Sequence, residues 1–257
     1  MKHWNRRSMI ASILIIFSSL VVVARDESFS GIWKLNLAKS QLAGGTYTIS
    51  KTAQALHWDS AGFAYDFDLT GKQYPTPMGT VSVTAPSPSV WEFTHRVNGK
   101  VVARNRGTLM GNSIIWAFTN ISSDGKSIQQ SSTDTRVSGG SGFIGKWKNG
   151  DIKGAATTLK ITVDAAGGII LDVPEYQWMC KGSFDNKDNI CTLAAKPSKY
   201  TSSFSKSSGT SFTMTTKLDG KPYYIDVYTV SADGKTLIDE GTALSNNEKT
   251  KSIYERL

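Results

Sequence analysis

The sequence has few cysteines, few histidines and little charge, and each shortage narrows the possible fold classes. Of 257 residues, 2 are Cys and 3 are His, which is too few for a metal-rich scaffold. Charged residues make up 19% of the chain, below the usual quarter or so, whereas aromatic residues make up 10% and Gly is abundant. This composition argues against disorder, a coiled coil and a helical bundle, and it favours a soluble, mostly β protein.

Motifs for covalent catalysis and cofactor binding are missing as well. No Gly-x-Ser-x-Gly elbow positions a Ser nucleophile, and no Gly-rich loop follows a strand and opens a helix to bind phosphate. Beyond residue 24, Lys and Arg never occur three in succession, which disfavours nucleic acid as a partner. We therefore expect no cofactor and no metal ion.

The first 24 residues have the three parts of a secretory signal peptide. Lys2, Arg6 and Arg7 precede an apolar run over residues 9–23, and Ala24 offers a small residue for cleavage. The run is shorter than the roughly 20 apolar residues of a spanning helix. We expect residues 1–24 to be removed and the protein to be exported to the periplasm or the extracellular space, with no stable membrane span. An uncleaved N-terminal anchor and export by a twin-arginine route are the alternatives.

The mature chain keeps both cysteines, Cys180 and Cys191. It has 233 residues and a net charge of +5, because the signal segment carries three positive charges of the total of +8. In an oxidising compartment the two thiols are expected to form a disulfide, which stabilises by about 3 kcal/mol on a loop-entropy argument. A metal site is the alternative. It is disfavoured because the remaining histidines, His57 and His95, lie far away in the sequence.

An internal repeat divides the mature chain. The motif Phe-x-Gly-x-Trp-Lys at residues 29–34 recurs 114 residues later, and three further matched segments follow in the same order. The matched segments are 29–34 with 143–148, 98–100 with 219–221, 123–126 with 232–235 and 135–137 with 255–257. We therefore expect two domains, residues 25–138 and 139–257, each large enough for its own core. The Gly- and Ser-rich seam at residues 138–141 is short, so the domains should touch.

Short alternating segments between turn residues indicate strands. Phe63, Tyr65 and Phe67 point to one side of such a segment, and the polar residues between them point to the other. Apart from a turn around residues 35–42, no segment has a helical period. Many short antiparallel strands form either a sandwich or a closed barrel, and closure removes exposed edges. We therefore predict an all-β fold with two tandem antiparallel up-and-down barrels.

The opening motif of each half resembles the first-strand Gly-x-Trp signature of the calycin superfamily, which contains the lipocalins and the fatty-acid-binding-like barrels. It comprises Gly31 and Trp33 in one half and Gly145 and Trp147 in the other. The resemblance implies that the Gly lets the strand bend and that the Trp plugs the closed end, covered by a basic residue of the last strand. Arg136 and Arg256 are suitably placed for that role. As a whole the chain resembles the tandem lipocalin-like domains of exported bacterial proteins.

One face of the first predicted barrel is rich in aromatic side chains. Trp91, Phe93 and His95 share a face of one strand, and the candidate binding site combines them with Phe63, Tyr65 and Phe67. A barrel of this size either fills its interior or holds one small ligand. The leading hypothesis is an exported protein that binds a small, largely apolar or aromatic molecule. The alternative for His95 is an imidazole packed and hydrogen-bonded in an apolar cluster.

Two further functions stay open. The protein is alternatively a structural or interaction module of the cell envelope with solid barrels. A third hypothesis is an isomerase, cyclase or hydrolase that uses His95, the single weak catalytic candidate. A triad of His57, Ser60 and Asp66 is disfavoured because sequence proximity does not create triad geometry. The sequence assigns no oligomeric state.

Two groups of polar residues have ambiguous roles. Asp66 and Asp68 share a strand face and suit either a glycosidase pair or a solvated outer surface. In the second half, Tyr224, Asp226 and Tyr228 share a face, which suits either a polar pocket wall or exposed cross-strand aromatics.

Overall fold

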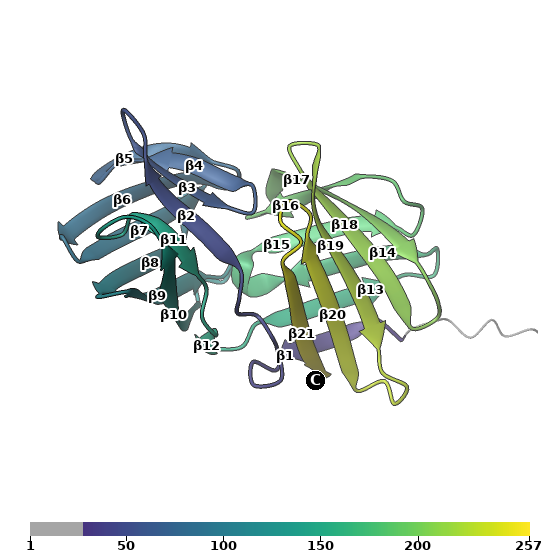
Figure 1. The fold of residues 1–257 in the computed structure, drawn as a ribbon. Helices are drawn as coiled ribbons and strands as arrows, with labels where there is room; N and C mark the ends of the chain where they lie inside the picture. The colour runs from purple at the N-terminus through teal and green to yellow at the C-terminus, as the bar shows by residue number, and fades with distance from the viewer. Residues whose placement is uncertain (1–27) are drawn as a thin grey trace, which may run out of the picture.

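The computed structural model describes residues 28–257, so the expected signal peptide lies outside the described residues. Strands dominate this region, which contains one short helix, the 3₁₀ helix η1 (Pro174–Tyr176). No helix in residues 28–257 has the length and apolarity needed to cross a membrane. Two antiparallel barrels lie side by side (Figure 1), which confirms the predicted all-β fold.

One barrel, here called the split barrel, is a closed sheet built from two separate parts of the chain. Its order is β1-β13-β14-β15-β16-β17-β18-β19-β20-β21, and β1 pairs with both β13 and β21 to close it. The strands are β1 (Gly31–Leu35), β13 (Thr158–Val163), β14 (Gly168–Val173), β15 (Trp178–Ser183), β16 (Asn189–Leu193), β17 (Lys196–Lys206), β18 (Ser211–Leu218), β19 (Lys221–Val230), β20 (Thr236–Ala243) and β21 (Lys249–Arg256).

The other barrel, here called the inserted barrel, comes from one continuous stretch. Its strand order is β4-β3-β2-β11-β10-β9-β8-β7-β6-β5, with β12 (Lys153–Gly154) paired to β10, and no β4–β5 ladder closes it. The strands are β2 (Thr46–Lys51), β3 (Leu56–Ser60), β4 (Phe63–Phe67), β5 (Thr70–Thr76), β6 (Gly79–Ser87), β7 (Val90–Val97), β8 (Lys100–Met110), β9 (Ser113–Ile121), β10 (Ser127–Ser138) and β11 (Gly145–Lys148).

The opening strands of the two halves are exchanged between the barrels. β1 belongs to the split barrel with residues 158–256, and β11 lies between β2 and β10 of the inserted barrel. The chain therefore does not divide at residue 138 into the contiguous barrels 25–138 and 139–257. The stretch expected to be a domain seam is instead the loop that joins β10 to β11 inside one barrel. The two opening motifs share the pattern Phe-x-Gly-x-Trp-Lys, and each forms the strand that pairs with the Arg-bearing strand of its barrel, β1 with β21 and β11 with β10.

The alternation of apolar and polar residues along the sequence matches the side chains that are buried in each core. Along β18 every second residue is buried, and along β4 Tyr65 and Phe67 are buried while Asp66 is exposed. Tight turns use the expected residues, because Asn98–Gly99 and Asp219–Gly220 adopt positive φ at both positions, as type I′ hairpins require. Local sequence thus determines strands and turns, while the exchange of β1 and β11 is a tertiary feature.

Each barrel contains a buried indole that is covered by a guanidinium group. Trp33 and Trp147 are 0% exposed, and the guanidinium carbons of Arg256 and Arg136 lie 4.1 Å from their respective ring centres. Because of the strand exchange, Arg136 covers Trp147, and Arg256 covers Trp33. The motif glycine makes room for this contact, since a Cβ on Gly31 would lie 2.8 Å from Arg256 Nη1.

The disulfide between Cys180 and Cys191 is confirmed. Both cysteines are completely buried in the split-barrel core, where the fully buried side chains also include Phe204 and Phe212. The bond ties β15 to β16 inside this core.

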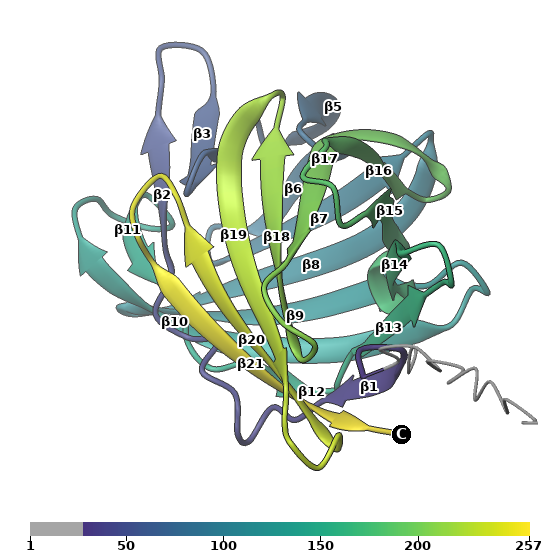
Figure 2. The same ribbon diagram turned by 90° about the vertical axis from the view of Figure 1, so that its right-hand side faces the viewer.

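Two adjacent chain connections join the barrels, because one barrel is inserted into the other. The backbone of Gly44 and Gly45 pairs with Asn149 through hydrogen bonds of 3.1 and 2.8 Å. Glu248 Oε1 of the split barrel accepts hydrogen bonds from the backbone nitrogen and the hydroxyl of Thr46, at 2.9 and 2.8 Å. On another side, the Tyr176 hydroxyl donates to Gln130 Oε1 at 3.3 Å. Figure 2 shows the barrels from the side on which the split barrel faces the viewer. These contacts hold one end of the inserted barrel against its neighbour.

Candidate functional site

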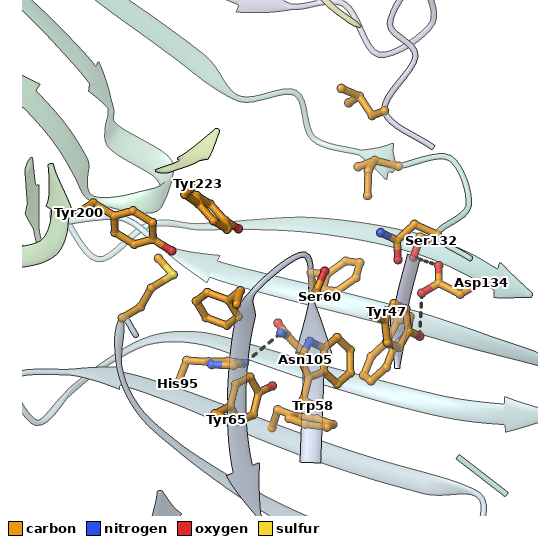
Figure 3. Close-up of a pocket in the computed structure, with 18 residues that line it drawn as sticks. Tyr47, Trp58, Ser60, Tyr65, His95, Asn105, Ser132, Asp134, Tyr200 and Tyr223 are labelled. Atoms are coloured by element: carbon orange, nitrogen blue, oxygen red, sulfur yellow. Dashed lines mark hydrogen bonds between the residues drawn. The ribbon is translucent and has the colours of Figure 1, made fainter. Parts of the chain in front are cut away.

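A cavity of about 440 Å³ lies in the inserted barrel and is lined by residues of both barrels. Figure 3 shows the inserted-barrel side chains gathered on one side, with Tyr200 of β17 and Tyr223 of β19 opposite them. The volume suits one small organic molecule. The lining residues are Leu42, Tyr47, Trp58, Ser60, Phe63, Tyr65, Met78, Phe93, His95, Asn105, Trp116, Phe118, Ser132, Asp134, Asn149, Ile152, Tyr200 and Tyr223.

Aromatic rings packed around Trp58 form much of the wall. Trp58 stacks on Tyr47, with ring centres 4.3 Å apart and planes 11° apart, and it lies nearly parallel to Tyr65 at 6.2 Å. The edges of Phe93 and Trp116 meet it at 6.2 and 6.1 Å. Such contacts between rings contribute about 0.5–1.5 kcal/mol each beyond the burial of their area, so the wall is organised before any ligand arrives.

A buried carboxylate, Asp134, gives the cavity a polar point. Its Oδ1 accepts hydrogen bonds from Ser132 Oγ at 2.8 Å and from the backbone nitrogen of Gly150 at 3.1 Å. Its Oδ2 accepts a hydrogen bond from the Tyr47 hydroxyl at 3.0 Å. Trp116 Nε1 in turn donates to the oxygen of that hydroxyl at 3.0 Å. Burial and the nearby Asp134 charge raise the pKa of Tyr47, so the phenol keeps its proton and acts as the donor.

His95 is a second polar point, and it is neutral. Burial lowers its pKa from 6.5 to about 4, because the surrounding protein disfavours the imidazolium ion. The amide nitrogen of Asn105 lies 3.2 Å from His95 Nε2. As this amide nitrogen is a donor, Nε2 accepts and the ring proton resides on Nδ1. A smaller hollow of about 220 Å³ also has His95 and Asn105 in its wall, so the two side chains lie between two open spaces.

The split barrel supplies two tyrosines to the same cavity. The rings of Tyr200 and Tyr223 lie 5.9 Å apart. Burial raises the pKa of both phenols, so each hydroxyl stays protonated at neutral pH and is a donor as well as an acceptor. The cavity wall therefore depends on how the two barrels are joined.

Of the six binding residues expected from the sequence, four line the cavity. These four are Phe63, Tyr65, Phe93 and His95. Trp91 and Phe67 point inward but pack in the core, where Trp91 stacks on Phe143 at 4.2 Å and Phe67 is 0% exposed.

Sequence reasoning considered Ser60 only as part of a disfavoured triad and assigned none of the other remaining wall residues to a binding site. Tyr47 alternates with Ile49 and Trp58 with Leu56 along their strands, so a search for alternating apolar residues identifies both. Asp134 lies in a polar stretch of β10 in which no apolar residue alternates with polar ones. The structure nevertheless buries Gln130, Ser132 and Asp134, which are two residues apart.

His57 does not contribute to the cavity. Its Nδ1 lies 2.7 Å from Asp66 Oδ1, and the Asp66 side chain is 57% exposed. Trp58, its neighbour in the chain, points to the cavity instead, as the alternation of a strand requires. Asp68, the other member of the expected carboxylate pair, accepts hydrogen bonds from Thr70 and from the Tyr74 hydroxyl. The His57–Asp66 contact therefore lies on the face of β3 and β4 that points away from the cavity.

A pair of acidic side chains lies inside the split barrel. Asp226 and Asp239 are 8% and 9% exposed, and their carboxyl groups share a hydrogen bond. Burial raises the pKa of both carboxyl groups, and the nearby charge of Asp239 raises the pKa of Asp226 further. Tyr228 is buried beside them, whereas Tyr224 is half-buried and its hydroxyl lies 2.7 Å from Thr250 Oγ1. The raised pKa values of Asp226 and Asp239 favour the protonated form of this buried pair.

In residues 28–257, no three side chains of His, Cys, Asp or Glu converge to hold a metal ion. No known protein family matches the chain, and no curated protein matches it either. The function is therefore inferred from the cavity, its aromatic wall and its two polar points.

Proposed function

We propose that the protein binds a small, largely apolar or aromatic molecule in the cavity of the inserted barrel. The observation that supports this most directly is the organised ring of aromatic side chains around about 440 Å³ of open space. Well-packed cores leave few voids larger than a water molecule, so an open space of this size in an aromatic wall suits a ligand. The alternative of an interaction module with solid barrels does not account for this space.

We also infer that both barrels are of the lipocalin-like, calycin type. The support is the antiparallel strand order of both barrels, the closure of the split barrel, the Gly-x-Trp strand and the guanidinium that covers each indole. The split barrel has ten strands, more than the eight of lipocalins proper. Export to the periplasm or the extracellular space is part of the same proposal, and it rests on the N-terminal signal pattern.

The proposal is tested by titrating the mature protein with a panel of aromatic and aliphatic compounds. Tryptophan fluorescence and thermal unfolding are recorded, because Trp58 and Trp116 line the cavity and a ligand that binds only the folded state raises Tm. Saturable changes with at least one compound class are expected. Saturation with none of them contradicts the proposal.

A cavity-blocking variant shows where the ligand binds. Ser60→Phe places a ring into the cavity, since Ser60 is part of its wall, and it should abolish the saturable signal. The matched control is Ser50→Phe on the neighbouring strand β2, where Ser50 pairs with the outward-facing His57. Equal loss of binding in both variants would place the ligand elsewhere.

A further inference from the structure

A carboxylate in the cavity wall lacks a cationic partner. Asp134 is 2% exposed, and its contacts in residues 28–257 are the three hydrogen-bond donors Ser132, Tyr47 and the backbone of Gly150. Buried carboxylates are usually balanced by Lys, Arg or a metal ion, because an uncompensated buried charge is costly. Within the described part of the chain, none of these balances Asp134.

The hydrogen-bond directions show that Asp134 acts as an acceptor at every contact. Trp116 Nε1 donates to the Tyr47 oxygen, so the single hydroxyl proton of Tyr47 is directed to Asp134 Oδ2. Ser132 and Gly150 donate to Oδ1. A carboxylate has about four acceptor positions, and three are occupied. The free one is on Oδ2, on a side chain that lines the cavity.

The cavity wall formed by residues 28–257 contains no Lys or Arg. The whole chain, by contrast, carries a net charge of +8. Arg96 borders the adjoining smaller hollow, where its guanidinium donates to Ser82 Oγ at 2.9 Å. His95 adds no charge at neutral pH, because burial lowers its pKa to about 4. The aromatic faces of the wall present negative potential, which attracts cations and repels anions.

We propose that the ligand carries a positively charged amino or quaternary ammonium group, which lies next to Asp134 Oδ2 while an aromatic or apolar body fills the rest of the cavity. This inference rests on the proposed function and specifies its ligand class. A primary amine donates a hydrogen bond to the free acceptor position of Oδ2, whereas a quaternary ammonium group interacts by charge and with the surrounding rings. Carboxylic acids, including fatty acids, have the wrong sign of charge for this wall.

A matched series of ligands separates charge from shape. The mature protein is titrated calorimetrically at pH 7 with 1-naphthylmethylamine, its N,N,N-trimethyl derivative, 1-naphthylmethanol and 1-naphthoic acid. All four carry the same ring system, so differences in affinity report the charged or polar group. We expect at least one of the two cations to bind about tenfold or more tighter than the alcohol, and the acid to bind weakest. Equal or tighter binding of the acid overturns the inference.

Two variants connect the preference to one side chain. Asp134→Asn should remove the preference for the cation over the alcohol while the alcohol still binds. Asp66→Asn removes the same charge on the outer surface and should leave the preference intact. An unchanged preference in folded Asp134→Asn overturns the inference, and should that variant fail to fold, the ligand order of the unaltered protein decides.

The outcomes also separate this inference from the proposed function. If the alcohol binds saturably and neither cation binds tighter, the ligand charge is wrong while the binding function stands. If none of the four naphthalene compounds and no member of the wider panel binds, both are wrong.

Discussion

His95 makes the stability of the inserted barrel depend on pH in a predictable direction. Its imidazole is neutral in the folded protein because burial lowers its pKa from 6.5 to about 4. In the unfolded chain the same group takes up a proton near its ordinary pKa. Between these two values the unfolded chain binds more protons than the folded one, so stability falls as the pH falls.

The size of this effect follows from the shift in pKa. A change from 6.5 to about 4 corresponds to about 3 kcal/mol, at about 1.4 kcal/mol for each pKa unit. The contribution of neutral His95 is fully present above pH 6.5 and is lost as the pH falls through about 4. His95→Gln keeps a neutral side chain that bonds to Asn105, and it removes the titration.

The assay compares urea unfolding of the unaltered protein and His95→Gln at pH 7.5 and at pH 4. Tryptophan fluorescence reports mainly on the inserted barrel, which contains Trp58, Trp91, Trp116 and Trp147. Lowering the pH from 7.5 to 4 should reduce the unfolding free energy of the unaltered protein more than that of His95→Gln. The extra reduction should be up to about 3 kcal/mol. Comparing the proteins at each pH cancels the titration of other groups.

His57→Gln is the matched control, because His57 lies on the outer surface next to Asp66. Its replacement should not reproduce the shift seen with His95→Gln. A difference between unaltered protein and His95→Gln that is the same at both pH values, or that shifts in the opposite direction, would refute the reasoning. It would mean that water in the cavity solvates the imidazolium as well as bulk solvent does.

Three further predictions follow from other parts of the fold. The pKa of buried Asp239 is raised from 3.8 to about 7, so the split barrel should lose stability as the pH rises from about 4 to about 7. The double variant Asp226→Asn/Asp239→Asn should lack this loss, and urea unfolding at pH 5 and pH 8 measures it; an equal loss in both proteins would be inconsistent with a buried acid pair. Arg256→Met should cost about 2–4 kcal/mol and lower Tm, because Arg256 covers Trp33 and donates to the carbonyls of Gly234, Ser30 and Ser28; an unchanged Tm would show that the cap contributes nothing. A fragment of residues 44–150 should fold alone, since it contains strands β2 to β11 of the inserted barrel and lacks only the two-residue β12, whereas residues 25–138 lack β11 and Trp147 and should not. Circular dichroism and cooperative unfolding of both fragments test this, and the reverse result would exclude the exchange of opening strands.

Much of the fold can be predicted from the sequence because its signals are local. The alternation of Phe63, Tyr65 and Phe67 with polar residues marks a strand, and Asn98–Gly99 marks a tight hairpin. The repeated Gly-x-Trp motif, with an Arg near the end of each half, indicates a capped indole at a barrel end. The structure shows an indole covered by a guanidinium group in each barrel.

The candidate site is harder to predict, because its wall combines residues that are distant in the sequence. Asp134 becomes part of the cavity only when β10 lies near Tyr47 of β2, and Tyr200 and Tyr223 come from the other barrel. Phe93 and Trp91 share one strand face, but only Phe93 lines the cavity. Trp91 is covered by Phe143, which the loop before β11 supplies.

The sequence by itself determined that this chain makes two antiparallel barrels and a disulfide, since periodicity, turn residues and cysteine count act over short distances. Tertiary structure alone decided which Trp lies in which barrel. The two opening strands share one motif, and the short loop of residues 139–144 lets β11 pair directly with β10, leaving β1 to close the other barrel. Because of that exchange, the strands of the inserted barrel lie in the sequence between β1 and β13 of the split barrel. Residues of both barrels then line one cavity.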